Sequence, residues 1–510
     1  MSVLIASIST TQAVSRVPVV SRSREIAGLG ALSLFALFFP LVTAPNGVLS
    51  QDLKFLVLLP GAGLLAALLL VHLLDNPGFA RSVRDCQLGL AISVVLASYT
   101  FLLCGLSPAA IGLSCFAPWL VLASRQLWGE TSRERRSVLM LAAGFVLMVV
   151  VSCFLSGRQY EAITGSLLLR TGLVTFLACL VVGFAACWLP RRRIEGIMVL
   201  KFLLVSGFVV GGVAWLQFFL PREMLPELFR PPVEDLRPYS FLGRPNWFGT
   251  YLLLVLPFAI HFMFRERFWR WRLLVALLHG SLLVCQTRGA WLAEGVMLGF
   301  ILVAARPDRK RLIELAVLLL AVTALLLPLQ DGRLLKRAGT MGLEAELAVN
   351  GSNSTGAGRF GFWKYGLKHL PEHALLGAGL DGYMSLADQG EQPPASKAHS
   401  IYLEYALTTG VIGLICYLVF LWKCFWTQAP RGFVWAFRAM LLAYLVQGFF
   451  IHDTIQTMPI LWLLAGLVLG PLARANNQSK DGTARDSASD HWLVISEARA
   501  PLAPPRTTTV

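Results

Sequence analysis

The sequence has little charge. Only 14% of its 510 residues are Asp, Glu, Lys or Arg, whereas 56% are hydrophobic. A soluble globular domain has about 25% charged and about 45–50% apolar residues, so the shortage of charge excludes an ordinary soluble protein. The apolar residues form runs of about 15–24, the length with which a helix crosses about 30 Å of hydrocarbon. We therefore expect an all-α polytopic membrane protein.

Several catalytic motifs are also missing. The sequence contains no P-loop, no G-x-S-x-G, no H-E-x-x-H and no D-x-D-like pair of carboxylates. Its nine cysteines form no C-x-x-C pair and fall within or beside apolar runs, which is typical of packing residues. We therefore expect no metal and no other cofactor, and a metal-independent reaction.

Most of the charged residues that are present are basic. The formal net charge of +15 is high enough to raise the question of nucleic-acid binding. However, the basic residues form no single patch and stand between the apolar runs, where Lys and Arg mark the cytoplasmic side of a membrane protein. We therefore expect no nucleic-acid partner and use these residues to orient the chain.

The alternation of apolar runs and basic connections predicts about fourteen membrane-spanning helices. Their approximate ranges are 25–44, 55–74, 86–105, 108–124, 137–156, 171–189, 197–220, 247–264, 273–287, 289–305, 312–328, 401–424, 434–452 and 457–473. With the N-terminal segment inside, every second connection is cytoplasmic and basic, and both termini are cytoplasmic. The first residues lack the apolar core of a cleavable signal, so we expect the first span to direct the chain to the membrane.

This orientation divides the chain into six parts. They are a cytoplasmic segment (1–24), an N-terminal transmembrane bundle (25–240) with an external segment at 221–246, further transmembrane helices (241–328), a large external loop with short helices (329–400), the C-terminal transmembrane helices (401–473) and a cytoplasmic tail (474–510). The composition of the tail predicts disorder. Long connections in a protein with otherwise short turns are where functional residues concentrate.

Two candidate sites lie where predicted spans begin at the external face. Arg288, in QTRGAWLA, has almost no polar loop around it, and an arginine at that depth is costly unless it pairs with an anion. A snorkelling interfacial arginine explains it equally well. In FLGRPNWFGTYL, Arg244 can hold an anion and Asn246 can bond a sugar hydroxyl, although Pro-Asn before a helix is also an ordinary turn and cap.

The external loop supplies two further candidates. We predict a short amphipathic helix from Arg359 to His369 that ends before Pro371. A cation at the start of a helix opposes the helix dipole, so Arg359 is hard to explain structurally. His399 ends the loop where the next span begins, and a histidine of near-neutral pKa at that place can act as a general base. An isolated histidine is more often a plain interfacial residue.

Five short motifs follow one another along the chain. They are RPNWFGTYL, TRGAWLA, R-x3-W from Arg359 to Trp363, PEHALLGAGLDGY and HSIYLEYALTTGVIGL. In this order, and on this side of the membrane, they resemble the O-antigen ligase and O-antigen polymerase superfamily over roughly residues 241–416. The sequence departs from the pattern at Thr287, where the family often has Ser, at Ser400, where it usually has Asn, and at Thr408, where it often has an acidic residue.

The resemblance implies a GT-C-like glycosyltransferase of lipopolysaccharide or polysaccharide biosynthesis in the bacterial inner membrane, with its active site facing the periplasm. The donor would be a glycan on undecaprenyl diphosphate and the acceptor a sugar hydroxyl. Our first expectation is an O-antigen ligase with lipid A-core as acceptor. A repeat-unit polymerase and a protein oligosaccharyltransferase stay open, as does a polysaccharide transporter from a different functional class. The oligomeric state also stays open.

The same resemblance implies roles for the candidate residues. His399 and Arg288 would be catalytic, with His399 taking the proton of the acceptor hydroxyl and Arg288 stabilising the diphosphate leaving group. The residues that would bind the diphosphate or the glycan are Arg359, Arg244, Asn246 and Trp363.

Overall fold

The structure of the protein is a computed structural model. It describes residues 19–44, 50–74, 133–166, 169–231, 235–266, 268–305, 307–329, 332–339, 358–386, 394–426 and 431–470. Within these ranges the chain is all-helical and contains no strand. The predicted spans 86–105 and 108–124, the tail 474–510 and nearly all of the N-terminal segment lie outside the described residues.

The helices follow the predicted apolar runs. The first half of the chain forms α1 (Val19–Phe38), α2 (Ser50–Leu74), α6 (Arg133–Leu155), α7 (Gln159–Thr164), α8 (Leu173–Trp188) and α9 (Arg193–Phe219). The second half forms α10 (Pro245–Arg265), α11 (Trp269–Val284), α12 (Arg288–Ala304), α13 (Arg309–Leu326), α15 (Arg359–His373), α16 (Ile401–Trp426), α17 (Arg431–Gln447) and α18 (Met458–Leu469). Every predicted span inside the described ranges coincides with one of these helices.

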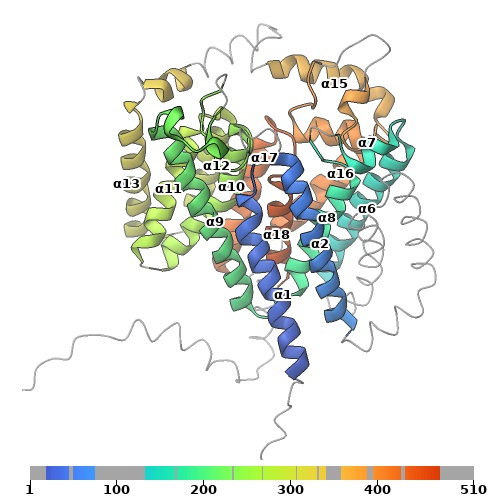
Figure 1. Ribbon diagram of the computed structural model, residues 1–510, viewed down its shortest axis with the longest axis horizontal. Coiled ribbons are helices and arrows are strands. Elements are labelled where there is room, and N and C mark those ends of the chain that lie inside the picture. The colour runs from blue at the N-terminus through green and yellow to red at the C-terminus, as the bar shows by residue number, and fades with distance from the viewer. Residues whose placement is uncertain are drawn as a thin grey trace, which may run out of the picture.

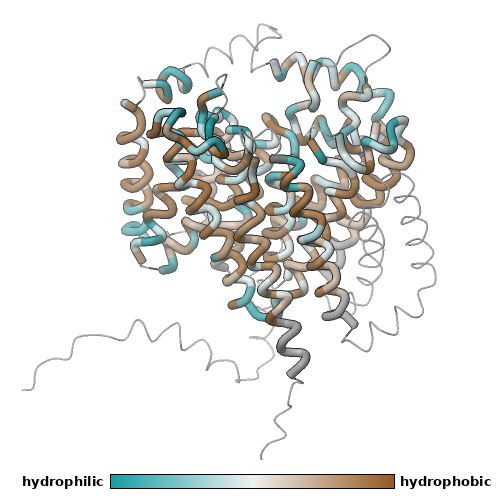
Figure 2. The backbone as a smooth tube through the Cα atoms, viewed as in Figure 1, coloured by the Kyte–Doolittle hydropathy of each residue, from teal (hydrophilic) through white to brown (hydrophobic). Residues whose placement is uncertain are grey.

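The described helices make this a multi-pass membrane protein. Four of them are long and apolar enough to cross a membrane by length and composition, namely Gln51–Leu69 within α2, together with α9, α10 and α16. Figure 2 shows that the helices are mainly hydrophobic along their middle and that hydrophilic positions gather near their ends. The total of about fourteen spans, and the side of the membrane on which each connection lies, stay predictions.

The helices pack as one bundle with α15 across its upper end (Figure 1). Helix α18 packs against α8, α8 against α2, and α16 against α6. Helix α17 packs against both α10 and α12, and α11 contacts α9, α10 and α13. The segments that carry the five motifs, α10, α12, α15 and α16, are thereby joined through α17 and α16 into one structure.

Connections that the basic residues assign to the same side of the membrane contact one another. On the predicted external side, Arg170 Nε donates to Asp52 Oδ1 at 2.6 Å. On the predicted cytoplasmic side, the guanidinium of Arg193 lies 5.7 Å from the ring centre of Phe433. This grouping is the one that alternating spans require.

The helix in the external loop is longer than the sequence predicts. We expected it to end before Pro371, but α15 continues through this residue to His373. A proline removes only one backbone N–H, and the carbonyl of His373 is bonded by the N–H of Gly377 at 2.9 Å. The end of the helix is therefore satisfied by the chain that follows it.

Helix α16 breaks at Gly410, and the segment after α15 docks into the break. Gly410 has φ of +75°, and a Cβ at this position would lie 2.3 Å from the carbonyl oxygen of Leu375. The carbonyls freed by the break accept backbone N–H groups, Leu407 from Ala378 at 2.8 Å and Thr408 from Gly379 at 3.0 Å. The break thus fixes the glycine-rich end of the loop against the helix that follows His399.

Candidate functional site

His399 lies at the meeting point of three parts of the chain. It lies two residues before α16 begins at Ile401, and the N–H of Ile401 donates to the carbonyl of Gly448 at 2.8 Å, which ties this helix start to the end of α17. The imidazole is half-buried between two rings. The ring centres of His399 and Phe362, from α15, are 5.4 Å apart, and those of His399 and His452 are 5.0 Å apart.

The backbone of His399 is held in an uncommon conformation. Its φ of +50° lies in the left-handed region, which costs a residue with a Cβ about 1–2 kcal/mol. Such conformations persist only where surrounding contacts impose them, and they cluster at functional sites. Asp381, in the same loop, also has a positive φ, of +60°.

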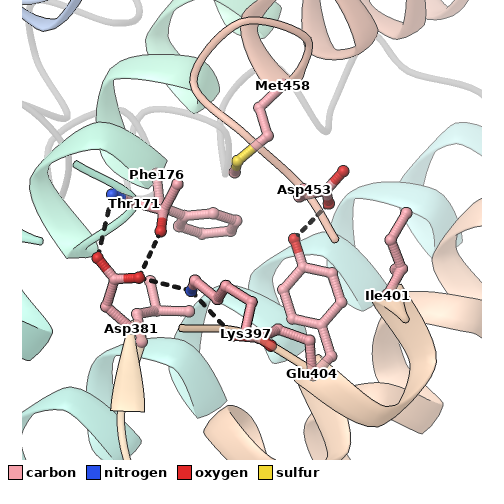
Figure 3. A pocket seen from close by; sticks show the side chains of 10 residues that line it. Thr171, Phe176, Asp381, Lys397, Ile401, Glu404, Asp453 and Met458 are labelled. Atoms are coloured by element: carbon pink, nitrogen blue, oxygen red, sulfur yellow. Dashed lines mark hydrogen bonds and ion pairs between the residues drawn. The ribbon is translucent and has the colours of Figure 1, made fainter. Parts of the chain in front are cut away.

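A buried cluster of ion pairs fixes the backbone on the N-terminal side of His399. Lys397 pairs with Asp381 and donates to Glu404 Oε1 at 2.8 Å (Figure 3). The other oxygen of Glu404 accepts the N–H of Ala398 at 2.9 Å, so the residue directly before His399 is also fixed. This cluster of Lys397, Asp381 and Glu404 anchors the end of the loop to the first turn of α16.

The cluster also reaches the connection before α8. Asp381 accepts the N–H of Ser166 and the hydroxyl of Thr171, each at 2.7 Å. Burial alone would raise the pKa of Asp381, but Lys397 and these hydrogen bonds lower it below its ordinary value. Burial would conversely lower the pKa of Lys397, and the two carboxylates instead raise it above its ordinary range. Asp381 and Lys397 are therefore charged at neutral pH.

The cavity beside this cluster is small. Its volume is about 20 Å³, and Thr171, Lys397 and Asp453 are among the residues that line it (Figure 3). A cavity needs about 10–15 Å³ to hold one water molecule, so this one has room for water and none for a sugar ring. The cluster therefore supports the site, and a glycan would bind elsewhere.

Three candidate arginines stand at helix starts. Arg244 is the N-cap of α10 and is exposed, while Arg288 and Arg359 are the first residues of α12 and α15 and are half-buried. The start of a helix already carries a partial positive charge, which disfavours a cation and favours an anion. The same unfavourable placement occurs three times, and an anion beside these helix starts would offset it.

Contacts bring these three helix starts together. The guanidinium of Arg359 lies 6.0 Å from the ring centre of Phe450, and a Cβ on Gly289 would lie 2.9 Å from the same ring. Only glycine at 289 allows the start of α12 to approach Phe450 this closely. The hydroxyl of Thr287 donates to Asn246 Oδ1 at 3.3 Å, which links the starts of α12 and α10.

Burial and nearby cations keep His399 neutral. Burial is the largest cause, and together with the positive charges of Arg359, Arg244 and Lys397 it lowers the pKa of His399 to about 4. The imidazole is therefore neutral at pH 7 and can accept a proton. Arg244 and Arg359 are close enough to His399 to act on it electrostatically, and Gly289, the residue after Arg288, lies against the same Phe450 ring as Arg359.

Two of the predicted site residues have other contacts. The side chain of Asn246 joins two helix starts and has no recorded contact with His399. Trp363 packs against Phe360, with ring centres 5.2 Å apart, and its indole N–H is buried without an acceptor among the described residues. It is the neighbouring Phe362 that packs on His399. Roles of Asn246 and Trp363 in glycan binding stay predictions.

The connection between α17 and α18 contributes residues to the site that were not among the predicted site residues. We expected a span at 434–452, but α17 ends at Gln447, so His452 and Asp453 belong to a buried connection. The carboxylate of Asp453 accepts hydrogen bonds from the hydroxyl groups of Tyr405 and Tyr444, each with an oxygen-to-oxygen distance of 2.7 Å. Burial raises the pKa of Asp453, against the effect of the two hydroxyls. The signal in the sequence was a His-Asp pair directly after an apolar run, since ionisable residues at membrane depth mark functional sites.

A comparison with known families covers four of the five motifs, all but RPNWFGTYL. Residues 273–418 match the model of a family described as O-antigen ligase. The chain is similar to O-antigen ligases over this segment. The resemblance to the O-antigen ligase and polymerase superfamily is therefore confirmed. No curated protein matches the chain.

The matched segment runs from α11 into α16. It contains Arg288, Arg359, Trp363 and His399, but it contains neither the start of α10 nor the connection between α17 and α18. The family indicates a transferase-type enzyme that modifies glycans, with a lipid-linked glycan and an acceptor as substrates in general terms.

Proposed function

We propose that the protein is an O-antigen ligase. It transfers a glycan from undecaprenyl diphosphate to a hydroxyl of lipid A-core at the periplasmic face of the inner membrane. The observation that carries this proposal is the placement of Arg244, Arg288 and Arg359 at three helix starts around a neutral, half-buried histidine. A diphosphate supplies the anion that this arrangement favours, and arginine binds phosphate oxygens bidentately.

The transfer follows from the positions of these groups. The acceptor hydroxyl loses its proton to His399 as its oxygen bonds to the anomeric carbon. The bond from that carbon to the diphosphate oxygen breaks, and its electron pair leaves with the diphosphate. The arginines stabilise the charge that develops on this leaving group. One displacement at the anomeric carbon inverts its configuration.

Substrate binding would prepare His399 for this role. With a pKa of about 4, the imidazole is unprotonated at neutral pH and can accept a proton, but it is a weak base. The negative charge of a diphosphate beside Arg244 and Arg359 offsets two of the cations that hold this pKa down. The pKa of His399 therefore rises toward its ordinary value when the donor is bound, which makes the base stronger at the moment of transfer.

Complementation tests the proposal. We expect the wild-type chain to restore glycan attachment to lipid A-core in a strain that lacks its own ligase. Arg288→Ala, Arg359→Ala and His399→Ala should abolish it at normal protein level. Lys364→Ala is the matched control, since Lys364 is an exposed residue of α15. Normal attachment in all three variants would refute the site.

The same assay separates the alternatives. Restoration of long glycan chains only in a strain that lacks its polymerase would instead mark a repeat-unit polymerase. Arg359→Lys adds a finer test, because lysine keeps the charge and loses the bidentate geometry. We expect Arg359→Lys to retain less activity than wild type and more than Arg359→Ala.

A further inference from the structure

The second histidine of the site is buried and unbonded. The side chain of His452 is only 4% exposed, and neither Nδ1 nor Nε2 has a hydrogen-bond partner among the described residues. A buried polar atom without a partner costs about 1–3 kcal/mol. Two such atoms on one side chain suggest that His452 forms a hydrogen bond when the protein acts on its substrates.

The arrangement of the two imidazoles identifies this partner. The ring centres of His399 and His452 are 5.0 Å apart, and the rings are inclined by 78°. Two imidazoles joined by an N–H···N hydrogen bond of about 3 Å have their centres about 5 Å apart. The observed separation of the ring centres therefore fits two imidazoles joined by such a hydrogen bond.

The carboxylates near the pair are engaged elsewhere. Asp453 accepts hydroxyl groups of Tyr405 and Tyr444, and Glu404 accepts from Lys397 and from a backbone N–H. Within the described residues no group accepts a hydrogen bond from the imidazole of His399. Among the described residues, no acidic group therefore orients His399 as one usually orients a catalytic histidine, and His452 is the imidazole beside it.

The remaining charges around the pair are positive. His452 is subject to the field of Lys397 and Arg244, and His399 also to that of Arg359. Burial, together with these cations and His399, lowers the pKa of His452 well below its ordinary value. His452 thus stays neutral and keeps one nitrogen free to accept a hydrogen bond.

We propose that His452 is the hydrogen-bond partner of His399 and holds the imidazolium that forms when His399 takes the acceptor's proton. One nitrogen of His399 receives the proton from the hydroxyl, and the N–H on the other side donates to a nitrogen of His452. No proton passes to His452, so it is a positioning residue. This inference rests on the proposed role of His399 as the base.

The test uses the purified full-length protein with an undecaprenyl-diphosphate-linked glycan and lipid A-core. We expect His452→Phe to lower kcat about 10- to 100-fold with little change in KM, the range seen when the hydrogen-bond partner of a metal-bound histidine is lost. His452→Gln should retain more activity, since its amide can still accept a hydrogen bond. His261→Phe is the matched control, because His261 is also buried, 3% exposed, but packs against Phe433 in α17.

The pH profile separates this role from simple packing. Loss of a hydrogen-bond acceptor lowers the pKa of His399 in the substrate complex, so the acid limb of kcat should move to lower pH in His452→Phe. A packing defect that admits water relieves the burial of His399 and moves the limb to higher pH. A shift to higher pH in both His452 variants would therefore overturn the proposal.

A second result distinguishes failure of the pairing between His399 and His452 from failure of His399 as the base. Full kcat and an unmoved limb in His452→Phe, with His399→Ala inactive, would refute the pairing and leave the proposed function intact. Full activity in His399→Ala would refute the base itself, and the pairing with it.

Discussion

The buried cluster of Lys397, Asp381 and Glu404 tests how the position of His399 is stabilised. Lys397, Asp381 and Glu404 have side chains that are 4%, 1% and 9% exposed. Replacing Lys397 with Met removes the only cation of this cluster and leaves two carboxylates buried together. It also frees the chain two residues before His399.

The size of the effect follows from burial. Removal of one partner of a buried ion pair costs about 3–5 kcal/mol, because the other charge stays uncompensated. Here one lysine faces two carboxylates, so we expect Lys397→Met to lower the free energy of unfolding by about this amount. The triple variant Lys397→Met, Asp381→Asn, Glu404→Gln removes the uncompensated charges and should recover much of the loss.

The cluster also has a defined pH window. The pKa of Asp381 is below its ordinary 3.8, so its contribution is present above about pH 4 and is lost as pH falls through the lowered value. The pKa of Lys397 is above its ordinary 10.5, so its contribution is present below about pH 10 and is lost as pH rises through the raised value. We expect it to be constant between these limits.

Thermal or denaturant unfolding of the purified protein in detergent measures these effects, with glycan transfer measured in parallel. Lys364→Met is the control for loss of an exposed lysine and should unfold like wild type. Wild-type stability of Lys397→Met would show that Lys397 does not stabilise the two buried carboxylates. A triple variant no more stable than Lys397→Met would show the same.

Three further predictions concern the kink, the base and the topology. Gly410→Ala should destabilise the protein by at least about 1–2 kcal/mol from the positive φ alone, and more from the contact with the carbonyl of Leu375. The acid limb of kcat/KM, which reports the free enzyme, should lie near pH 4, whereas the limb of kcat should lie at higher pH because the bound diphosphate raises the pKa of His399. An impermeant label applied from the periplasmic side should reach a cysteine placed at Gly390 and not one at Lys480.

Each of these has a control or a contradicting result. Gly299→Ala, where a new Cβ meets nothing within 4 Å, should be neutral or slightly stabilising, and equal loss in both glycine variants would contradict the account of the kink. Arg244→Ala removes one cation near His399 and should move the limb of kcat/KM to higher pH; no movement would mean that Arg244 does not act on the base. Labelling at Lys480 alone would reverse the topology.

The sequence determined the helical architecture of this protein and most of its site. Apolar runs of membrane-crossing length predicted the described helices other than α7 and α15, because a chain in hydrocarbon must satisfy its backbone within helices. Arg288, Arg359 and His399 were found because each is costly or unusual where it stands, a property that can be recognised from sequence position alone.

Only the tertiary structure decided what surrounds these residues. The pairing of Lys397 with Asp381 and Glu404 joins positions from two parts of the loop and from α16, and no local pattern predicts such contacts. The same holds for His452, which lies 53 positions after His399 and which the sequence assigned to the end of a span. Local chemistry and periodicity are written along the chain, whereas the proximity of distant side chains depends on how the helices pack.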